Sequence, residues 1–176
     1  MLYQADWSSG LNGWAGPSSW KTVAGQLVTD GSNSSNILAP YQPTPPNYAI
    51  EAQIQVAQHP VCGGWWGIVA RLTQTGYYTF KQGWGGCGVG DELDWVDTSS
   101  GGNNTNTIMG ASGPPDPGTS WHIYRLEVKD NVLTLKIDGS MIMTVSDNHD
   151  LDPGQVGLFA GDGAQLNVQS FKVIAL

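Results

Sequence analysis

The sequence predicts an all-β protein, a two-sheet antiparallel β-sandwich that spans residues 1–176 as a single domain. Short runs rich in β-branched and aromatic residues alternate with clusters of Gly, Pro, Asn, Asp and Ser, which is the pattern of strands joined by turns. No stretch of a dozen residues has the apolar spacing of an amphipathic helix. About a dozen antiparallel strands, each with one apolar face, do not fit in one open sheet, so we expect a sandwich or jelly roll.

The composition is that of a folded, acidic domain. Of the 176 residues, 24 are Gly and 8 are Trp, only 12% are charged, and the formal net charge is -8. Such a charge repels phosphate backbones and anionic lipids, which argues against nucleic acid or membrane-surface partners. No run approaches the ~18–20 consecutive apolar residues of a membrane span, so we expect no membrane insertion.

The expected strands are taken in chain order. They lie near Trp20–Val23, Gln26–Asp30, Ile37–Tyr41, Tyr48–Ala57, Trp65–Leu72, Tyr77–Trp84, Glu92–Val96, Thr107–Met109, Trp121–Lys129, Val132–Ile137, Met141–Val145, Gln155–Ala160 and Gln165–Ile174. The segments YQPTPPN and SGPPDPGTS between them are turns or loops, because neither is long enough for an interdomain linker.

Two turns in the last third of the chain fix the expected pairing there. A turn at Asp130-Asn131 makes every facing pair apolar on one side: Val128 with Leu133, Leu126 with Leu135, and Tyr124 with Ile137. For the next turn a two-residue loop would leave the apolar residues of the following strand outside. A three-residue loop, Asp138 to Ser140, keeps them inside, so we expect the pairs Ile137 with Met141, Leu135 with Met143, and Leu133 with Val145.

A mirror repeat marks the middle of the chain. Residues 62–65 read CGGW and residues 84–87 read WGGC. In an antiparallel hairpin with its turn before Gly76, Cys62 would face Cys87 and Trp65 would face Trp84. We therefore favour a disulfide between the only two cysteines over two free, buried thiols, and a disulfide indicates an oxidising, extracellular or cell-surface location.

Adjacent strand residues point to opposite faces, so only one of the neighbours Trp65 and Trp66 belongs to the core. Trp66 heads an apolar row with Ile68, Ala70 and Leu72, and Trp65 shares the other face with Val69 and Arg71. An indole and a guanidinium on one outer face suit a sugar, whose C–H face stacks on aromatic rings. The competing interpretation places Trp65 under a loop.

The facing strand leaves two registers open. The mirror register sets Trp84 beside Trp65, whereas apolar matching puts Tyr78 and Phe80 in the core and turns Lys81 outward. A one-residue shift with a bulge among the glycines satisfies both patterns. Trp84 and Lys81 are therefore both candidate ligand-binding residues.

The C-terminal sequence resembles the concanavalin A-like lectin/glucanase superfamily. The resemblance rests on SWHIYRLEVKDNVLTLKIDGSMIMTVSD and GQVGLFAGDGAQLNVQSFKVIAL, with earlier matches in DWSSGLNGWAG, NYAIEAQIQV and GIVARLTQTGYYTF. It implies a jelly-roll fold over most of the chain. It leaves function open, because the superfamily includes carbohydrate-binding modules, laminin G-like adhesion domains and glycoside hydrolases.

The segment DELDWVD, residues 91–97, is the strongest enzyme signal. It resembles the Glu-x-Asp-x-x-Glu motif of retaining β-glucanases of this fold, in which two carboxyls lie ~5–5.5 Å apart. Glu92 and Asp94 match the first two positions, but Asp97 stands where the motif has Glu. We therefore favour an acidic segment flanking a sugar site, with Asp94 and Trp95 as contacts, over catalysis by Glu92, Asp94 and Asp97.

Calcium is a further expectation, because related jelly rolls often hold a structural Ca²⁺ and hard oxygen ligands are plentiful. The candidates are Asp91, Asp97, Asn103, Asn104, Asp147, Asp150 and Asp152. For any one of them, an Asx-turn in a solvated loop is the favoured explanation over a calcium ligand. The histidines are scattered, so a zinc site is not expected.

Three functions remain in view. We favour a noncatalytic, extracellular domain that binds a polysaccharide or other glycan through Trp65, Arg71, Lys81 or Trp84, Asp94 and Trp95. The alternatives are a glycoside hydrolase using residues 91–97, and a structural or adhesion domain whose partner is protein, including a second copy of itself.

Overall fold

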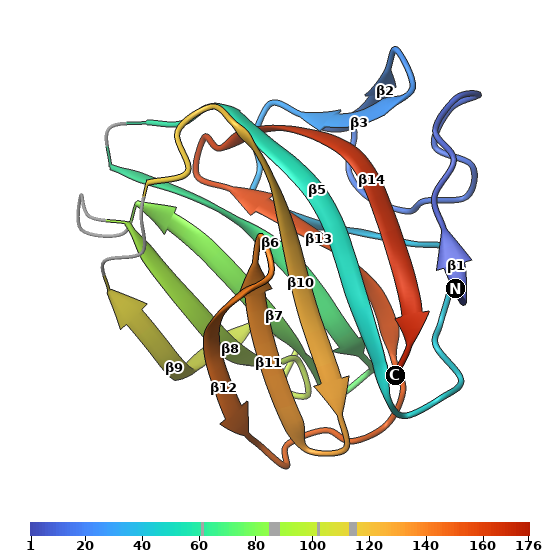
Figure 1. Cartoon of the computed structure of the whole chain (residues 1–176), viewed down its shortest axis with the longest axis vertical. Helices are drawn as coiled ribbons and strands as arrows, with labels where there is room; N and C mark the ends of the chain where they lie inside the picture. The colour runs from blue at the N-terminus through green and yellow to red at the C-terminus, as the bar shows by residue number, and fades with distance from the viewer. Residues whose placement is uncertain (61, 85–88, 102, 113–115) are drawn as a thin grey trace.

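The structure, a computed structural model, confirms the all-β sandwich (Figure 1). It describes residues 1–60, 62–84, 89–101, 103–112 and 116–176, without the side chains of Trp84 and Ser112. Every regular element in these ranges is a β-strand, and the strands form two antiparallel sheets stacked face to face. None of the described residues belongs to a helix long and apolar enough to span a membrane.

The first sheet, sheet A, is the one nearer the viewer in Figure 1. Its strands run in the order β12-β11-β10-β5-β14-β3-β2, and the short β1 pairs with β14. Their bounds are β1 Tyr3–Gln4, β2 Trp20–Val23, β3 Gln26–Thr29, β5 Tyr48–Gln58, β10 Trp121–Lys129, β11 Val132–Ile137, β12 Ser140–Ser146 and β14 Gln165–Ala175.

The second sheet, sheet B, lies behind it in Figure 1 and runs in the order β4-β13-β6-β7-β8-β9. Its bounds are β4 Ser35–Leu38, β6 Gly63–Leu72, β7 Gly76–Trp84, β8 Gly90–Asp97, β9 Asn104–Ser112 and β13 Gln155–Gly161. The expected strands are all present. Seven are one to three residues longer than expected, β9 is six longer, three match, and β3 and β4 are each one residue shorter, with β4 ending at Leu38 rather than Tyr41. The two-residue β1 was not foreseen, because it is too short to show an apolar period.

The core fills the space between the two sheets. Alternate residues of the central strands point inward, as in the row Trp66, Ile68 and Ala70 of β6, all of them fully buried. The N-terminal segment adds Trp7 and Trp14, which pack edge to face with a ring-centroid distance of 5.5 Å. Trp7 and Trp14 therefore extend the core between the two sheets.

The C-terminal hairpins confirm most of the expected register and correct one pair. The pairs across Asp130-Asn131 are as predicted, and so are Leu135 with Met143 and Leu133 with Val145. Met141, however, faces Lys136 and is 66% exposed, so its predicted pairing with Ile137 is wrong. The reason is that the loop has two residues, Asp138-Gly139, both with positive φ, and a bulge between Leu135 and Lys136 restores the apolar register.

The β6–β7 hairpin resolves the choice left open by the mirror repeat. Trp66 faces Gln82, Ile68 faces Phe80, and a register shift falls between Gly63 and Trp65. The pairing is thus displaced by one residue from the mirror register along this stretch, and the bulge at the glycines displaces it by one more, so Trp84 faces Gly63 rather than Trp65. Tyr78 and Phe80 consequently lie in the core. Cys62 is not a free thiol, but Cys87 lies outside the described residues, so the Cys62–Cys87 disulfide stays a prediction.

Arg71 does not lie on the outer face, so that expectation is wrong. Its backbone has φ 53°, and the β6–β13 register shifts beside it, which breaks the strand's alternation and turns the side chain inward. The guanidinium is 1% exposed. Its Nη2 donates to the carbonyl of Asp130 at 2.6 Å and to that of Pro46 at 3.4 Å, and Nη1 donates to the carbonyl of Asp150 at 3.1 Å. Arg71 ties three loops together at one end of the sandwich.

Replacing Arg71 tests this structural role. We expect Arg71→Met to lower the free energy of unfolding by about 2–4 kcal/mol, because it removes the donors of buried carbonyl groups. Arg71→Lys recovers only part of that loss, because one ammonium cannot reproduce the planar fork. Urea unfolding measures both variants. A stability of Arg71→Met within 0.5 kcal/mol of the wild type, roughly the surface-substitution range, would contradict the role.

Candidate functional site

The candidate site lies on the outer face of sheet B, where three neighbouring strands present a tryptophan and three charged side chains. The register places Gly67 of β6 opposite Lys81 of β7, and Lys81 opposite Glu92 of β8. Alternation then puts Trp65, Lys81, Glu92 and Asp94 on the same face, away from the core. We call these four residues the Trp65 patch.

Trp65 is the partly exposed member of the Trp65-Trp66 pair, and Trp66 is fully buried. This confirms the predicted division of the two indoles. The indole lies over Gly83, where an added Cβ would come within 2.8 Å of ring atoms Cδ2 and Cε3. The absence of a side chain at Gly83 therefore lets the ring lie against the sheet. The Lys81 Nζ stands 5.2 Å from the ring centroid, a cation–π distance.

Lys81 links the indole to the two carboxylates. Its Nζ lies 2.6 Å from Asp94 Oδ2 and 3.3 Å from Glu92 Oε2. Burial by itself would lower the pKa of Lys81, but the hydrogen bonds and charges of Asp94 and Glu92 outweigh it and raise the pKa above its ordinary value. The lysine therefore stays protonated. The side chain of Asp94 is fully buried, while that of Glu92 is 32% exposed, so Glu92 is the carboxylate that a ligand can reach.

An apolar cluster supports the patch along the same face. Val69, Tyr77 and Val96 are buried there, with the partly buried Leu38, Leu72 and Phe159 packed around them. Phe159 faces Gly67, which itself faces Lys81. Rigid apolar neighbours thus flank the charged group on one side, which limits the side-chain freedom that a ligand would have to restrict.

Two further predicted contacts are not in the patch. Trp95 is 6% exposed and faces the core, where its ring lies 5.0 Å from that of Tyr78 and stacks on that of His149 at 5.4 Å. Its predicted sugar contact is wrong, because Trp95 alternates with the outward-facing Asp94. The side chain of Trp84 lies outside the described part of the chain. Of the two open candidates for the neighbouring strand, Lys81 is the one placed beside Trp65.

The three carboxylates of the glucanase-like motif are not brought together. Glu92 and Asp94 share the outer face and one ammonium group. Asp97 is at the end of β8 and accepts hydrogen bonds from the backbone N–H and the hydroxyl of Ser99 at 2.8 and 2.6 Å. These bonds lower its pKa. Asp97 therefore serves as a turn-forming residue rather than as a partner of Glu92 and Asp94.

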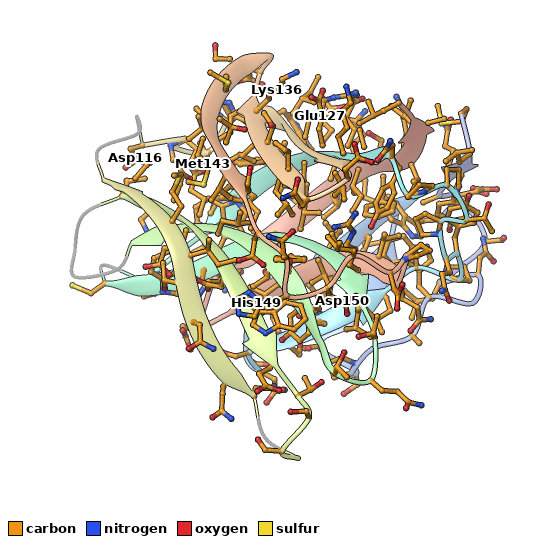
Figure 2. All side chains as sticks on the ribbon, turned by 90° about the horizontal axis from the view of Figure 1, so that it is seen from below. Asp116, Glu127, Lys136, Met143, His149 and Asp150 are labelled. Carbon is orange, nitrogen blue, oxygen red and sulfur yellow. The ribbon has the colours of Figure 1, made fainter. Side chains whose placement is uncertain are left out.

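The oxygen-bearing side chains expected for calcium are spread over β8, the start of β9 and the loops after β8 and after β12, and Asp91 is fully buried. Figure 2 shows Asp150 beside His149 near the middle of the view, and Asp116 at its left side. Within the described ranges no group of three or more His, Cys, Asp or Glu side chains is placed to hold a metal ion. Calcium stays a prediction of the sequence.

One polar side chain, expected from the sequence only as a calcium ligand, lies inside the sandwich. Asp91 points inward beside Gln82, its partner across β7 and β8, and is fully buried. Gln82 is 1% exposed, and its Oε1 accepts a hydrogen bond from the hydroxyl of Tyr124 at 2.7 Å. Burial raises the pKa of Asp91 to about 6, although Gln82 opposes the shift. Alternation from Leu93 already indicated an inward Asp91.

Comparisons with known proteins agree with the fold. No protein-family model and no curated protein sequence matches the chain. Among solved structures, the carbohydrate-binding module CBM66 from Bacillus subtilis superposes with a TM-score of 0.73 at 14% identity, covering 93% of this chain and 96% of that one. This chain has a concanavalin A-like jelly-roll fold.

Two enzymes share the jelly roll as well. An endo-β-1,3-glucanase from Pyrococcus furiosus gives a TM-score of 0.71 at 11% identity, covering 99% of this chain and 94% of that one. A β-1,3-glucanase from Mycobacterium marinum gives 0.59 at 17% identity, covering 88% and 77%. At such identities the likeness concerns the jelly roll alone, so function has to be argued from the Trp65 patch.

The buried Asp91 should make the free energy of unfolding depend on pH. Because its folded-state pKa of about 6 lies above the ordinary 3.8, the folded protein holds this proton more tightly than the unfolded chain. Stability from Asp91 is therefore present below pH 4 and is lost as the pH rises to 6. We expect Asp91→Asn to raise the free energy of unfolding at pH 7 by about 1–2 kcal/mol.

Urea unfolding at pH 4, 5, 6 and 7 measures this difference. The gain should grow between pH 4 and 6 and then level off, while the exposed control Asp152→Asn stays near the wild type at every pH. A gain independent of pH, or a destabilisation at pH 7, would contradict the prediction, because it would mean that the charged carboxylate of Asp91 does not destabilise the folded protein.

Proposed function

We propose that the protein is a noncatalytic carbohydrate-binding domain and that the Trp65 patch is its glycan-binding site. The observation that carries this proposal is the partly exposed indole of Trp65, held against the sheet beside a charged triad on the outer face of sheet B. A flat aromatic ring bordered by hydrogen-bonding groups is what a sugar ring needs, since its C–H face is apolar and its edge carries hydroxyls.

Each member of the patch has a distinct part in this proposal. The indole of Trp65 stacks on a sugar ring. Glu92 accepts hydrogen bonds from sugar hydroxyls through its exposed carboxylate, and Lys81 donates to them through its ammonium. Asp94, fully buried and 2.6 Å from Lys81, holds the ammonium in position. Stacking with a few exposed hydrogen bonds gives a Kd of about a micromolar or weaker.

The structural neighbours support the same proposal at the level of the fold. The Bacillus subtilis carbohydrate-binding module matches almost end to end in both directions. We propose an extracellular or cell-surface setting, because a polysaccharide partner and the predicted Cys62–Cys87 disulfide both point there.

A glycoside hydrolase is the second candidate. Glu92 and Asp94 lie on one strand face, and two glucanases share the fold. Against it, both carboxylates contact the same lysine, and Asp97 is engaged with Ser99. The noncatalytic function therefore has the stronger support.

Glycan binding is tested by comparing two partly exposed tryptophans. Trp65→Ala should weaken binding to a polysaccharide by about tenfold or more, because loss of stacking costs about 1–3 kcal/mol. Trp121→Ala is the matched control, because Trp121 lies at the start of β10, partly exposed on the outer face of sheet A. Affinity electrophoresis and calorimetry against β-1,3-glucan, levan, xylan and cellulose measure the effect. Equal loss in both variants, or no binding by the wild type, would refute the proposed site.

The hydrolase alternative has a separate readout. The wild type should release no reducing sugar from the same polysaccharides, and Glu92→Gln should weaken binding by removing a charged acceptor. Release of reducing ends by the wild type that disappears in Glu92→Gln would instead establish catalysis. The exposed Asp152→Asn, which belongs to neither the patch nor its supporting residues, controls for general effects of charge removal.

A further inference from the structure

A second cavity lies between the two sheets, apart from the Trp65 patch. It has a volume of about 290 Å³ and is lined by Gln82 of sheet B and by residues of β10, β11 and β12 and their turn in sheet A: His122, Ile137, Asp138, Ser140 and Ile142. We call it the end cavity. Figure 2 shows the labelled Asp116, another of its lining residues, on the same side as Met143 of β12. At ~30 Å³ for each water, the space corresponds to about ten water molecules.

The floor of the end cavity is polar although it lies inside the sandwich. Gln82 contributes its amide there, with Oε1 bound to the Tyr124 hydroxyl at 2.7 Å. Asp91, the strand partner of Gln82, lies fully buried beside it. Apolar side chains at these positions would make a more stable core, since a buried carboxylate is costly without a strong partner. Buried polar groups gathered at a cavity are typical of a binding site.

In one wall of the end cavity, both ring nitrogens of His122 lie within hydrogen-bond distance of oxygen atoms. His122 Nδ1 lies 2.6 Å from Asp138 Oδ2, and Nε2 lies 3.0 Å from the carbonyl oxygen of Pro117. The other oxygen of Asp138 accepts a hydrogen bond from the backbone N–H of Ile123 at 2.8 Å. The Pro117 segment and the Asp138 turn are therefore fixed to each other, so this wall is preorganised.

The lining selects the chemistry of a ligand. Ile137 and Ile142 present an apolar wall, while Ser140 supplies a hydroxyl and Gln82 an amide whose Oε1 already accepts one hydrogen bond from Tyr124 and can accept a second. Among the described lining residues the carboxylates Asp116 and Asp138 are present and no Lys or Arg is. Because the whole chain carries a net charge of -8, an anion is repelled. A neutral ring with one apolar face and several hydroxyls meets all of these conditions.

We propose that the end cavity is a second binding site, which takes one neutral sugar ring or a polyol of that size. One face of the ring packs on Ile137 and Ile142, and hydroxyls at its edge bind the Gln82 amide and the Ser140 hydroxyl. This site is separate from the Trp65 patch, because the patch lies on the outer face of sheet B and the end cavity lies between the sheets.

The test follows the isoleucine methyl groups by NMR. Protein labelled at Ile δ1 methyls is titrated with D-glucose, D-galactose, D-xylose and D-fructose, with D-glucuronate as the anionic comparison. We expect at least one neutral sugar to shift the Ile137 and Ile142 methyls with a Kd of roughly 1–30 mM, a free energy typical of a single small ligand with few contacts. Ile50 and Ile68, in the core, should not move. Glucuronate should bind at least about tenfold more weakly than the best neutral sugar.

Three variants locate the binding. Ser140→Phe fills the mouth of the cavity and should abolish the methyl shifts. Thr144→Phe, on the same strand but bonded outward to Thr134 at 2.9 Å, is the matched control and should leave them unchanged. Trp65→Ala should also leave them unchanged, which separates this site from the proposed glycan site. Thermal unfolding of each variant confirms that it is folded.

Four results would overturn the proposal. They are no methyl shift with any of the four neutral sugars up to about 100 mM, shifts that survive in a folded Ser140→Phe, shifts lost in Trp65→Ala, or equal affinity for glucuronate. In the first case the cavity holds water only, and Gln82 and Asp91 are a structural polar cluster. The binding assay at Trp65 is unaffected by that outcome.

Discussion

The pairing of β6 with β7 is the constraint on which the rest of the molecule depends. From Trp65 to Ala70 this hairpin pairs one residue away from the mirror register, so Tyr78 and Phe80 enter the core and Lys81 turns outward. Had the mirror register held, every side chain of β7 would have changed faces, and the polar Lys81 would have met the apolar interior. This register thus satisfies the hydrophobic pattern of both strands and creates the charged outer face.

The same pairing separates two chemically different environments on opposite faces of sheet B. On the outer face, the Lys81 ammonium forms ion pairs with the carboxylates of Glu92 and Asp94 and a cation–π contact with the indole of Trp65. Inside, Asp91 and Gln82 face each other across β7 and β8 on the core side, and among the described residues no Lys or Arg forms an ion pair with Asp91. The alternation of β7 and β8 therefore determines which charges are neutralised and which remain buried.

Much of this arrangement could be predicted from the sequence, because periodic patterns fix strands and faces. The division of Trp65 and Trp66, the pairs across Asp130-Asn131, and the shifted β6–β7 register all follow from apolar matching. The inward orientation of Arg71 could not be predicted. It depends on a positive φ and on hydrogen bonds to loop carbonyls that are distant in sequence. Met141 was misplaced because a bulge, invisible in the pattern, absorbed the extra residue. Long-range polar contacts and single-residue bulges are what periodicity does not encode.

The most direct measurement of the central claim is ¹⁹F NMR of the protein labelled with 5-fluorotryptophan. Its eight tryptophans give separate signals, and the signal that disappears in Trp65→Phe is assigned to Trp65. Adding a polysaccharide that the protein binds should change the ¹⁹F chemical shift of Trp65. The chemical shift of Trp66, one residue away but buried in the core, should not change. If the Trp65 signal is unmoved by a glycan that binds, or if Trp66 proves to be the one in contact with solvent, the account is wrong.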